Sequence, residues 1–182
     1  MAATEEMNPL DISKFAMSSC FSDVTIIVQN EKIPSHKLVL GAASPVLLSL
    51  LTSDMKEARE NIIVIEDVEL YVMKIVLKYL YTGAIVSSGY LTYLRILAVA
   101  EKYAMSSLKS LIEEELMASI NATNVIEILD YANLHRANKL KQTAMQYIIH
   151  NKHNLIGSES FKALCYNNHE LMMEFLILFA KR

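Results

Sequence analysis

The sequence predicts an α+β domain, a small three-stranded sheet flanked by helices, followed by an all-helical extension. Three short segments are expected to be strands, Val24–Gln29, Glu31–Ser35 and Asn61–Ile65, and the first and third are rich in the β-branched residues typical of strands. No such segment follows Asn121, where apolar residues recur at helical spacing. The 182 residues are 53% hydrophobic and include only four glycines and three prolines, which favours a mostly helical chain with a buried core.

A short apolar segment precedes the strands. Residues 1–9 are small and polar, and we expect them to be poorly ordered. Asp11–Ser19 carries apolar residues on one side and is expected to form a short helix. Pro34 has no backbone N–H to donate, which places the second strand at an edge of the sheet.

Local signals mark the helices that follow. His36–Ala43 is expected to be helical, and Ser44 and Pro45 begin the next helix as its N-cap and first helical residue. After the third strand, Asp67 is expected to cap a long amphipathic helix, which Gly83 ends in a left-handed conformation. Further helices are expected at Tyr90–Ala104, from Ser106 or Ser107 onward, and at Thr123–His135, Asn138–His153, 159–166 and 169–181.

Composition excludes several classes of function. The net charge is −3 with scattered basic residues, which disfavours nucleic-acid binding, and no apolar run is long enough to span a membrane. Cys20 and Cys165 cannot form a disulfide framework, so we expect an intracellular protein, nuclear or cytoplasmic. His150 and His153 have helical spacing without further ligands nearby. We therefore expect no metal, no cofactor and no catalytic site.

An ordered set of motifs resembles the BTB/POZ family, and the speckle-type POZ proteins within it. The similarity runs from Phe21 to about Asn151 and more weakly to Phe179. The resemblance implies a BTB/POZ fold over residues 10–119, with three-box and partial BACK helices over 120–182. The motifs are Phe21-x-Asp-Val, Ser35-His36-Lys37-x-x-Leu40, Ala43-Ser44-Pro45, Asp67-Val68, Tyr79–Gly83, Ala100–Tyr103 and Leu108.

The resemblance implies a homodimer in which the first helix and the His36–Ala43 helix pack against a second copy. The first helix is too short to bury its apolar residues by itself, although it could instead cap the core of one monomer. The residues expected at the dimer interface are Leu10, Ile12, Phe15, Met17, Leu38, Val39 and Ala42.

Met55, Lys56 and Glu57 resemble the cullin-contacting motif of the family, an apolar residue, any residue, then Glu. A flexible thioether on an exposed loop can fill a pocket of a partner, and the Glu can fix the loop through backbone hydrogen bonds. Alternatively, this is a polar connection in which Met55 folds back on the core. The resemblance completes the cullin-3 cleft with Tyr103, Val125 and Leu129.

Asp23 and Lys37 match an acidic and a basic residue that the family places in a pocket at the dimer seam. Some transcriptional relatives recruit co-repressors near this pocket. The alternative is an ion pair that fixes the register of the fold.

The last helix is apolar nearly all round, whereas one helix can bury only a single stripe against its own domain. By resemblance it forms a second self-association surface, which together with the dimer seam would permit linear oligomers. A helix buried in a groove is the alternative. The residues expected on this surface are Leu171, Phe175, Leu176 and Phe179.

The implied function is a non-catalytic adaptor that self-associates, binds cullin-3 and presents a substrate protein to a ubiquitin ligase. Speckle-type relatives carry a separate N-terminal substrate-binding domain, so we expect either that this chain is a piece of a longer protein or that substrates bind elsewhere. The alternatives are an oligomerisation scaffold without cullin binding and a transcriptional co-regulator. A potassium-channel-type tetramerisation domain is disfavoured by the long helical tail.

Overall fold

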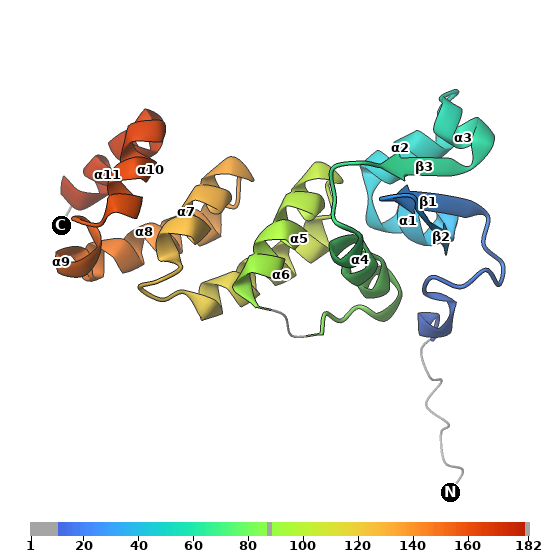
Figure 1. The fold of residues 1–182 in the computed structure, drawn as a ribbon, viewed down its shortest axis with the longest axis horizontal. Helices are drawn as coiled ribbons and strands as arrows, with labels where there is room; N and C mark the ends of the chain where they lie inside the picture. Colours follow the sequence, from blue (N-terminus) through green and yellow to red (C-terminus); the bar gives the residue numbers. More distant parts are fainter. Residues whose placement is uncertain (1–10, 87–88, 181–182) are drawn as a thin grey trace, which may run out of the picture. The chain divides into compact units, whose positions relative to one another are not determined.

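The computed structural model describes residues 11–86 and 89–180, apart from the side chains of Asn154 and Asn167. The chain divides into two compact units. The first unit holds Met1–Ser88 and Tyr103–Met105, and the second holds Gly89–Lys102 and Ser106–Arg182. Figure 1 draws both units in the colours of the sequence.

The first unit is built on a three-stranded sheet, as the sequence predicts, and the structure gives the strand order β2-β1-β3. β1 (Val24–Val28) pairs antiparallel with β2 (Glu31–Ser35) and parallel with β3 (Ile62–Ile65). Burial alternates along β1, where every second side chain is buried, as in a sheet with one face on the core. The edge position expected for Pro34 is confirmed, because β2 borders the sheet.

Two helix ends of the first unit lie where local signals predict them. The Ser44 hydroxyl accepts a hydrogen bond from the Leu47 N–H at 3.0 Å and donates one to the Tyr103 carbonyl at 2.5 Å. Gly83 ends the long helix with a φ of +67°. The helices are η1 (Ser13–Phe15, a 3-10 turn), α1 (Lys37–Ala43), α2 (Pro45–Thr52), α3 (Lys56–Glu60) and α4 (Leu70–Thr82).

Three details of the first unit differ from expectation. The helix expected over Asp11–Ser19 is only the single turn η1, and a φ of +56° at Met17 turns the chain away from a helical path. The connection after α2 contains the short helix α3, which ends at a left-handed Asn61. α4 begins at Leu70, later than a cap at Asp67 requires.

The described part of the second unit consists of helices joined by turns and loops, without a strand. Its core buries apolar side chains from the facing sides of consecutive helices, among them Val125, Ile148 and Phe175. The expected helices are confirmed with boundary shifts, and the one expected at Asn138–His153 divides in two. The helices are α5 (Tyr90–Lys102), α6 (Ser106–Ser119), α7 (Val125–Leu134), α8 (Asn138–His150), α9 (Lys152–Leu155), α10 (Glu159–Asn167) and α11 (His169–Ala180).

Two polar clusters fix α7 within this unit. At its N-terminal end, the buried Asn124 accepts from the Asn121 N–H at 2.8 Å and donates to the Ser119 carbonyl at 2.9 Å. At its C-terminal end, the Lys109 ammonium lies 2.7 Å from Glu101 and donates to the carbonyl of His135 at 2.9 Å. These contacts hold both ends of the helix. No helix within residues 11–86 or 89–180 is long and apolar enough to cross a bilayer.

Candidate interaction surfaces

An apolar groove lies beside the N-terminal arm, the segment Asp11–Phe21. Its volume is about 290 Å³. Phe21 and Leu38 are the most exposed of its apolar side chains, at 82% and 84%. We call it the arm groove, and its lining residues are Ile12, Phe15, Phe21, Asp23, His36, Leu38, Val39 and Tyr81.

The structure brings most of the residues expected at the dimer interface to this region. Ile12, Phe15 and Val39 are half-buried and line the arm groove beside the exposed Leu38. Met17 is half-buried and Ala42 is exposed. Leu10 lies outside the described residues.

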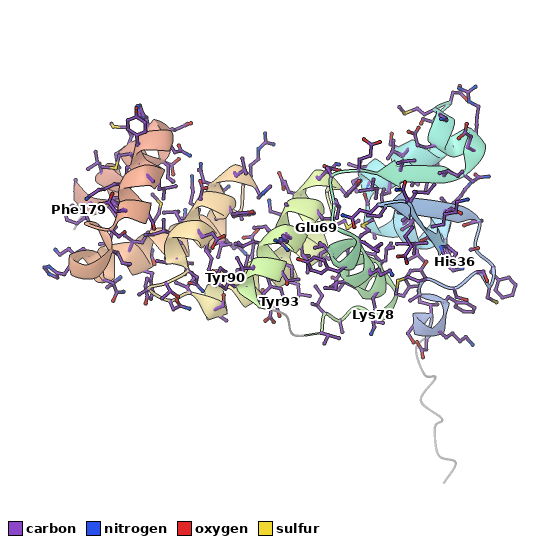
Figure 2. The ribbon with its side chains drawn as sticks, in the orientation of Figure 1. His36, Glu69, Lys78, Tyr90, Tyr93 and Phe179 are labelled. Atoms are coloured by element: carbon purple, nitrogen blue, oxygen red, sulfur yellow. The ribbon has the colours of Figure 1, made fainter. Side chains whose placement is uncertain are left out.

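His36 occupies the polar base of the arm groove and is labelled in Figure 2. Its Nδ1 lies 2.7 Å from the Tyr81 hydroxyl, and its Nε2 lies 2.9 Å from the Cys20 carbonyl oxygen. The ring also packs edge-on against Phe15 at 6.0 Å between centroids. Burial raises the pKa of Tyr81, which keeps its hydroxyl protonated as a donor. His36 therefore joins the arm to α4.

Asp23 contacts the backbone of Lys37, whereas the sequence suggested an ion pair with its side chain. Asp23 Oδ1 accepts a hydrogen bond from the backbone N–H of Lys37 at 2.8 Å, at the start of α1. Asp23 is exposed and Lys37 is half-buried. The carboxylate thus satisfies a free N–H in the first turn of a helix, and an anion is favoured at that end of the helix dipole.

Met55 is exposed at 50% and occupies the N-cap position of α3. Lys56 is exposed and Glu57 is half-buried in the first turn of the helix. Arg59 donates to the Asp54 carbonyl at 3.1 Å, so this arginine holds the preceding chain, a role that the sequence assigned to Glu57. Met55 does not fold back into the core.

Three residues expected in the cullin-3 cleft are buried. Tyr103 is 4% exposed in the first unit, and Val125 and Leu129 are at most 1% exposed in the second. The outward side of α7 lines a separate cavity of about 560 Å³ with α10. The α7 side of that cavity includes Thr123, Ile126, Glu127 and Asp130.

The residues expected on the second self-association surface divide between two sides of α11. Leu171 and Phe175 are buried, and the Phe175 ring packs edge-on against Phe161 at 5.3 Å. Leu176 and Phe179 are 47% and 41% exposed. Met173 and Ile177 are also exposed, which the sequence alone did not separate from the buried set.

No part of the described chain groups three His, Cys, Asp or Glu side chains around a possible metal ion. His150 and His153 are exposed, and His150 Nδ1 lies 2.7 Å from the Gln146 carbonyl of its own helix. Burial raises the pKa of the Cys165 thiol, which disfavours the reactive thiolate.

Sequence reasoning missed Phe21 and His36 as parts of one interaction surface. Both stand in the motifs quoted above, but neither was assigned to the interface. Phe21 has a φ of +59°, an uncommon conformation for an aromatic residue. The available signal was a bulky aromatic residue at the start of the Phe21-x-Asp-Val motif.

Two solved structures resemble part of the chain. The BTB domain of zebrafish PATZ1 is 21% identical, with a TM-score of 0.49, over 59% of this chain and 92% of that one. The BTB domain of human gigaxonin is 23% identical, with a TM-score of 0.49, over 63% of this chain and 98% of that one. The sequence model of the BTB/POZ domain matches residues 12–120, more than half of this chain, which therefore belongs to the BTB/POZ family.

Proposed function

We propose that this protein self-associates through the arm groove and serves as a substrate adaptor that docks cullin-3. BTB domains are protein-interaction modules that generally self-associate and typically have no catalytic activity. The helices after residue 120 are assigned in this proposal to three-box and partial BACK regions, as in speckle-type POZ proteins. The observation that carries the cullin-3 part is the exposed Met55 at the start of α3.

Self-association is supported by apolar exposure at the arm groove. Phe21 and Leu38 expose most of their side chains around a cavity that is otherwise lined mainly by apolar residues. Burying a side chain of this size contributes about 1.5–3 kcal/mol. In a two-fold dimer each contact occurs twice, so these two residues are expected to dominate the interface. Asp23 and Lys37 then lie at its seam.

Cullin-3 docking is supported by the form of α3. Met55 is the residue directly before the helix. The hydrogen bond from Arg59 to the Asp54 carbonyl fixes the backbone next to it. Glu57 lies in the first turn, where a carboxylate complements the helix dipole. A thioether held on a fixed backbone can enter an apolar pocket of the partner at a low entropic cost.

The proposed contribution of α7 changes with the burial of Val125 and Leu129. Because those side chains support the core, a partner of α7 meets its outward side at the exposed Glu127 and Asp130. Tyr103 likewise acts through packing. The exposed side of α11, at Leu176 and Phe179, is proposed as a second self-association surface.

Calorimetric titration with the N-terminal region of cullin-3 tests the adaptor function. Met55→Asp is expected to weaken binding at least tenfold, about 1.4 kcal/mol, since a charge would enter the apolar pocket. Asp130→Lys, at an exposed residue on the outward side of α7, tests that helix by the same titration. Tyr166→Asp changes another exposed side chain, 81% accessible on α10, and is expected to bind as wild type does.

An oligomerisation scaffold without cullin-3 binding is the second candidate. Two separate apolar surfaces favour it, the arm groove and the exposed side of α11. A folded, self-associated wild-type protein that shows no heat of binding with cullin-3 would support the scaffold and contradict the adaptor.

A further inference from the structure

We infer that His36 is a positioning residue for self-association, because it clamps the N-terminal arm against α4 and so presents Phe21 at the rim of the arm groove. This inference rests on the proposed self-association and names the side chain that prepares the surface for it. His36 reaches both the arm and α4 with directional contacts.

The hydrogen bonds determine which ring nitrogen carries the proton. A carbonyl oxygen only accepts, so Nε2 must donate to the Cys20 carbonyl, at 2.9 Å. In the neutral ring Nδ1 then has no hydrogen and accepts from the Tyr81 hydroxyl, at 2.7 Å. Each nitrogen thus has the role that its partner requires, and the ring is fixed at both ends.

The arm has little regular structure of its own. Its helical content is the single turn of η1, and its other backbone hydrogen bonds shown within the arm are local, such as Ser18 N–H to the Phe15 carbonyl at 3.1 Å. Met17 and Phe21 both have positive φ values, +56° and +59°. Such conformations persist only where surrounding contacts enforce them.

The clamp acts next to the residue that it presents. The Cys20 carbonyl held by His36 belongs to the peptide group that leads directly into Phe21. The Phe15 ring contacts both side chains edge-on, with centroids 6.0 Å from Phe21 and 6.0 Å from His36. Loss of the Nε2 contact therefore frees the peptide that orients Phe21, while the sheet keeps its own ladder.

Two amide substitutions each retain one hydrogen bond of His36 and so test the two contacts separately. In His36→Asn, the side-chain oxygen can replace Nδ1 as acceptor for Tyr81, but no donor reaches Cys20. In His36→Gln, the amide nitrogen can replace Nε2 as donor to Cys20. Tyr81→Phe removes the hydroxyl alone, and His153→Asn makes the same chemical change at an exposed residue of α9.

Sedimentation equilibrium of the full chain measures self-association, and amide hydrogen exchange measures order in the arm relative to β1. We expect His36→Asn to weaken dimerisation at least tenfold and to accelerate exchange over Phe15–Ser22, with β1 unchanged. His36→Gln is expected to restore both, and His153→Asn to match wild type. Tyr81→Phe is expected to have an intermediate effect, and it replaces His36→Asn in the comparison if that variant does not fold.

Each other outcome overturns a defined part of the proposal. A His36→Asn dimer as tight as wild type, or equal weakening in Asn and Gln variants, would exclude the positioning role while leaving self-association intact. A wild-type protein that stays monomeric at the highest concentration used in sedimentation equilibrium would overturn both self-association and the inference that depends on it.

Discussion

The arm groove and the exposed side of α11 are two apolar surfaces that are built in different ways. The arm groove gathers side chains from an irregular arm, from α1 and from α4 around the hydrogen bonds of His36. The surface on α11 is the outer side of one regular helix, anchored by the buried Phe175 and by a 2.6 Å contact between Lys141 and Glu174. Hydrogen bonds of one polar side chain can thus hold an apolar surface in place where no regular helix or strand carries it.

The difference has a consequence for how substitutions act. Changes at the arm groove are expected to alter association with little effect on the core, because the exposed residues add nothing to it. Changes on α11 act on stability or on association according to the side of the helix.

Leu38→Asp should have the largest effect, on self-association. Leu38 is 84% exposed, so the substitution costs the monomer little, but each dimer would bury two carboxylates and lose two apolar contacts. We expect a loss of about 3–6 kcal/mol in dimerisation, two contacts of about 1.5–3 kcal/mol each, measured by sedimentation equilibrium. Leu134→Asp, at a 71% exposed residue of α7, is the matched control. A dimer unaffected by Leu38→Asp would remove the arm groove from the interface.

Phe175→Ala should act on stability instead. The Phe175 ring is 5% exposed and packs against Phe161, so truncation leaves a cavity in the helical unit. Such substitutions cost about 3–5 kcal/mol, which chemical denaturation followed by far-ultraviolet circular dichroism would detect. Leu176→Ala, on the exposed side of the same helix, is expected to change stability by less than about 1 kcal/mol. Equal losses in the two variants would contradict the division of α11 into two sides.

The division of α11 into a buried and an exposed side also shows what the sequence could predict. Apolar spacing identified the helix, but a helix that is apolar nearly all round does not reveal which side is buried. Val125 and Leu129 illustrate the same point, since most residues of α7 are apolar and the sequence did not show that these two face the core. In contrast, the Ser44 cap and the Gly83 stop were predictable, because their signals are local.

The arm groove was less predictable because its contacts connect distant residues. His36 lies 16 residues from Cys20 and 45 residues from Tyr81 in the sequence, and no spacing rule links them. The helix α3 was missed for another reason. It is five residues long, too short for a periodic pattern to appear.

Asn124→Ala tests the polar clamp at the start of α7. Asn124 is 2% exposed, and its amide bonds the Asn121 N–H and the Ser119 carbonyl. Removal leaves these backbone groups without that partner, at a cost of about 1–3 kcal/mol, measurable by chemical denaturation. Asn138→Ala, at an exposed residue that begins α8, is the control. An unchanged midpoint for Asn124→Ala would mean that water replaces the side chain.

The smallest expected effect is a pH dependence at the other end of α7. Burial lowers the pKa of His135 below the usual 6.5 of histidine; the Glu101 carboxylate opposes this shift, and the nearby Lys109 ammonium adds to it. The unfolded chain therefore binds the proton more readily, so stability is full above about pH 6.5 and falls as the pH drops through the folded pKa. Chemical denaturation from pH 7.5 to 5 should show wild type losing stability relative to His135→Gln. Parallel curves for the two proteins would assign the acid sensitivity to other groups, and the Lys109 contacts to the His135 and Arg136 carbonyls would then hold the end of α7 without any contribution from the imidazole.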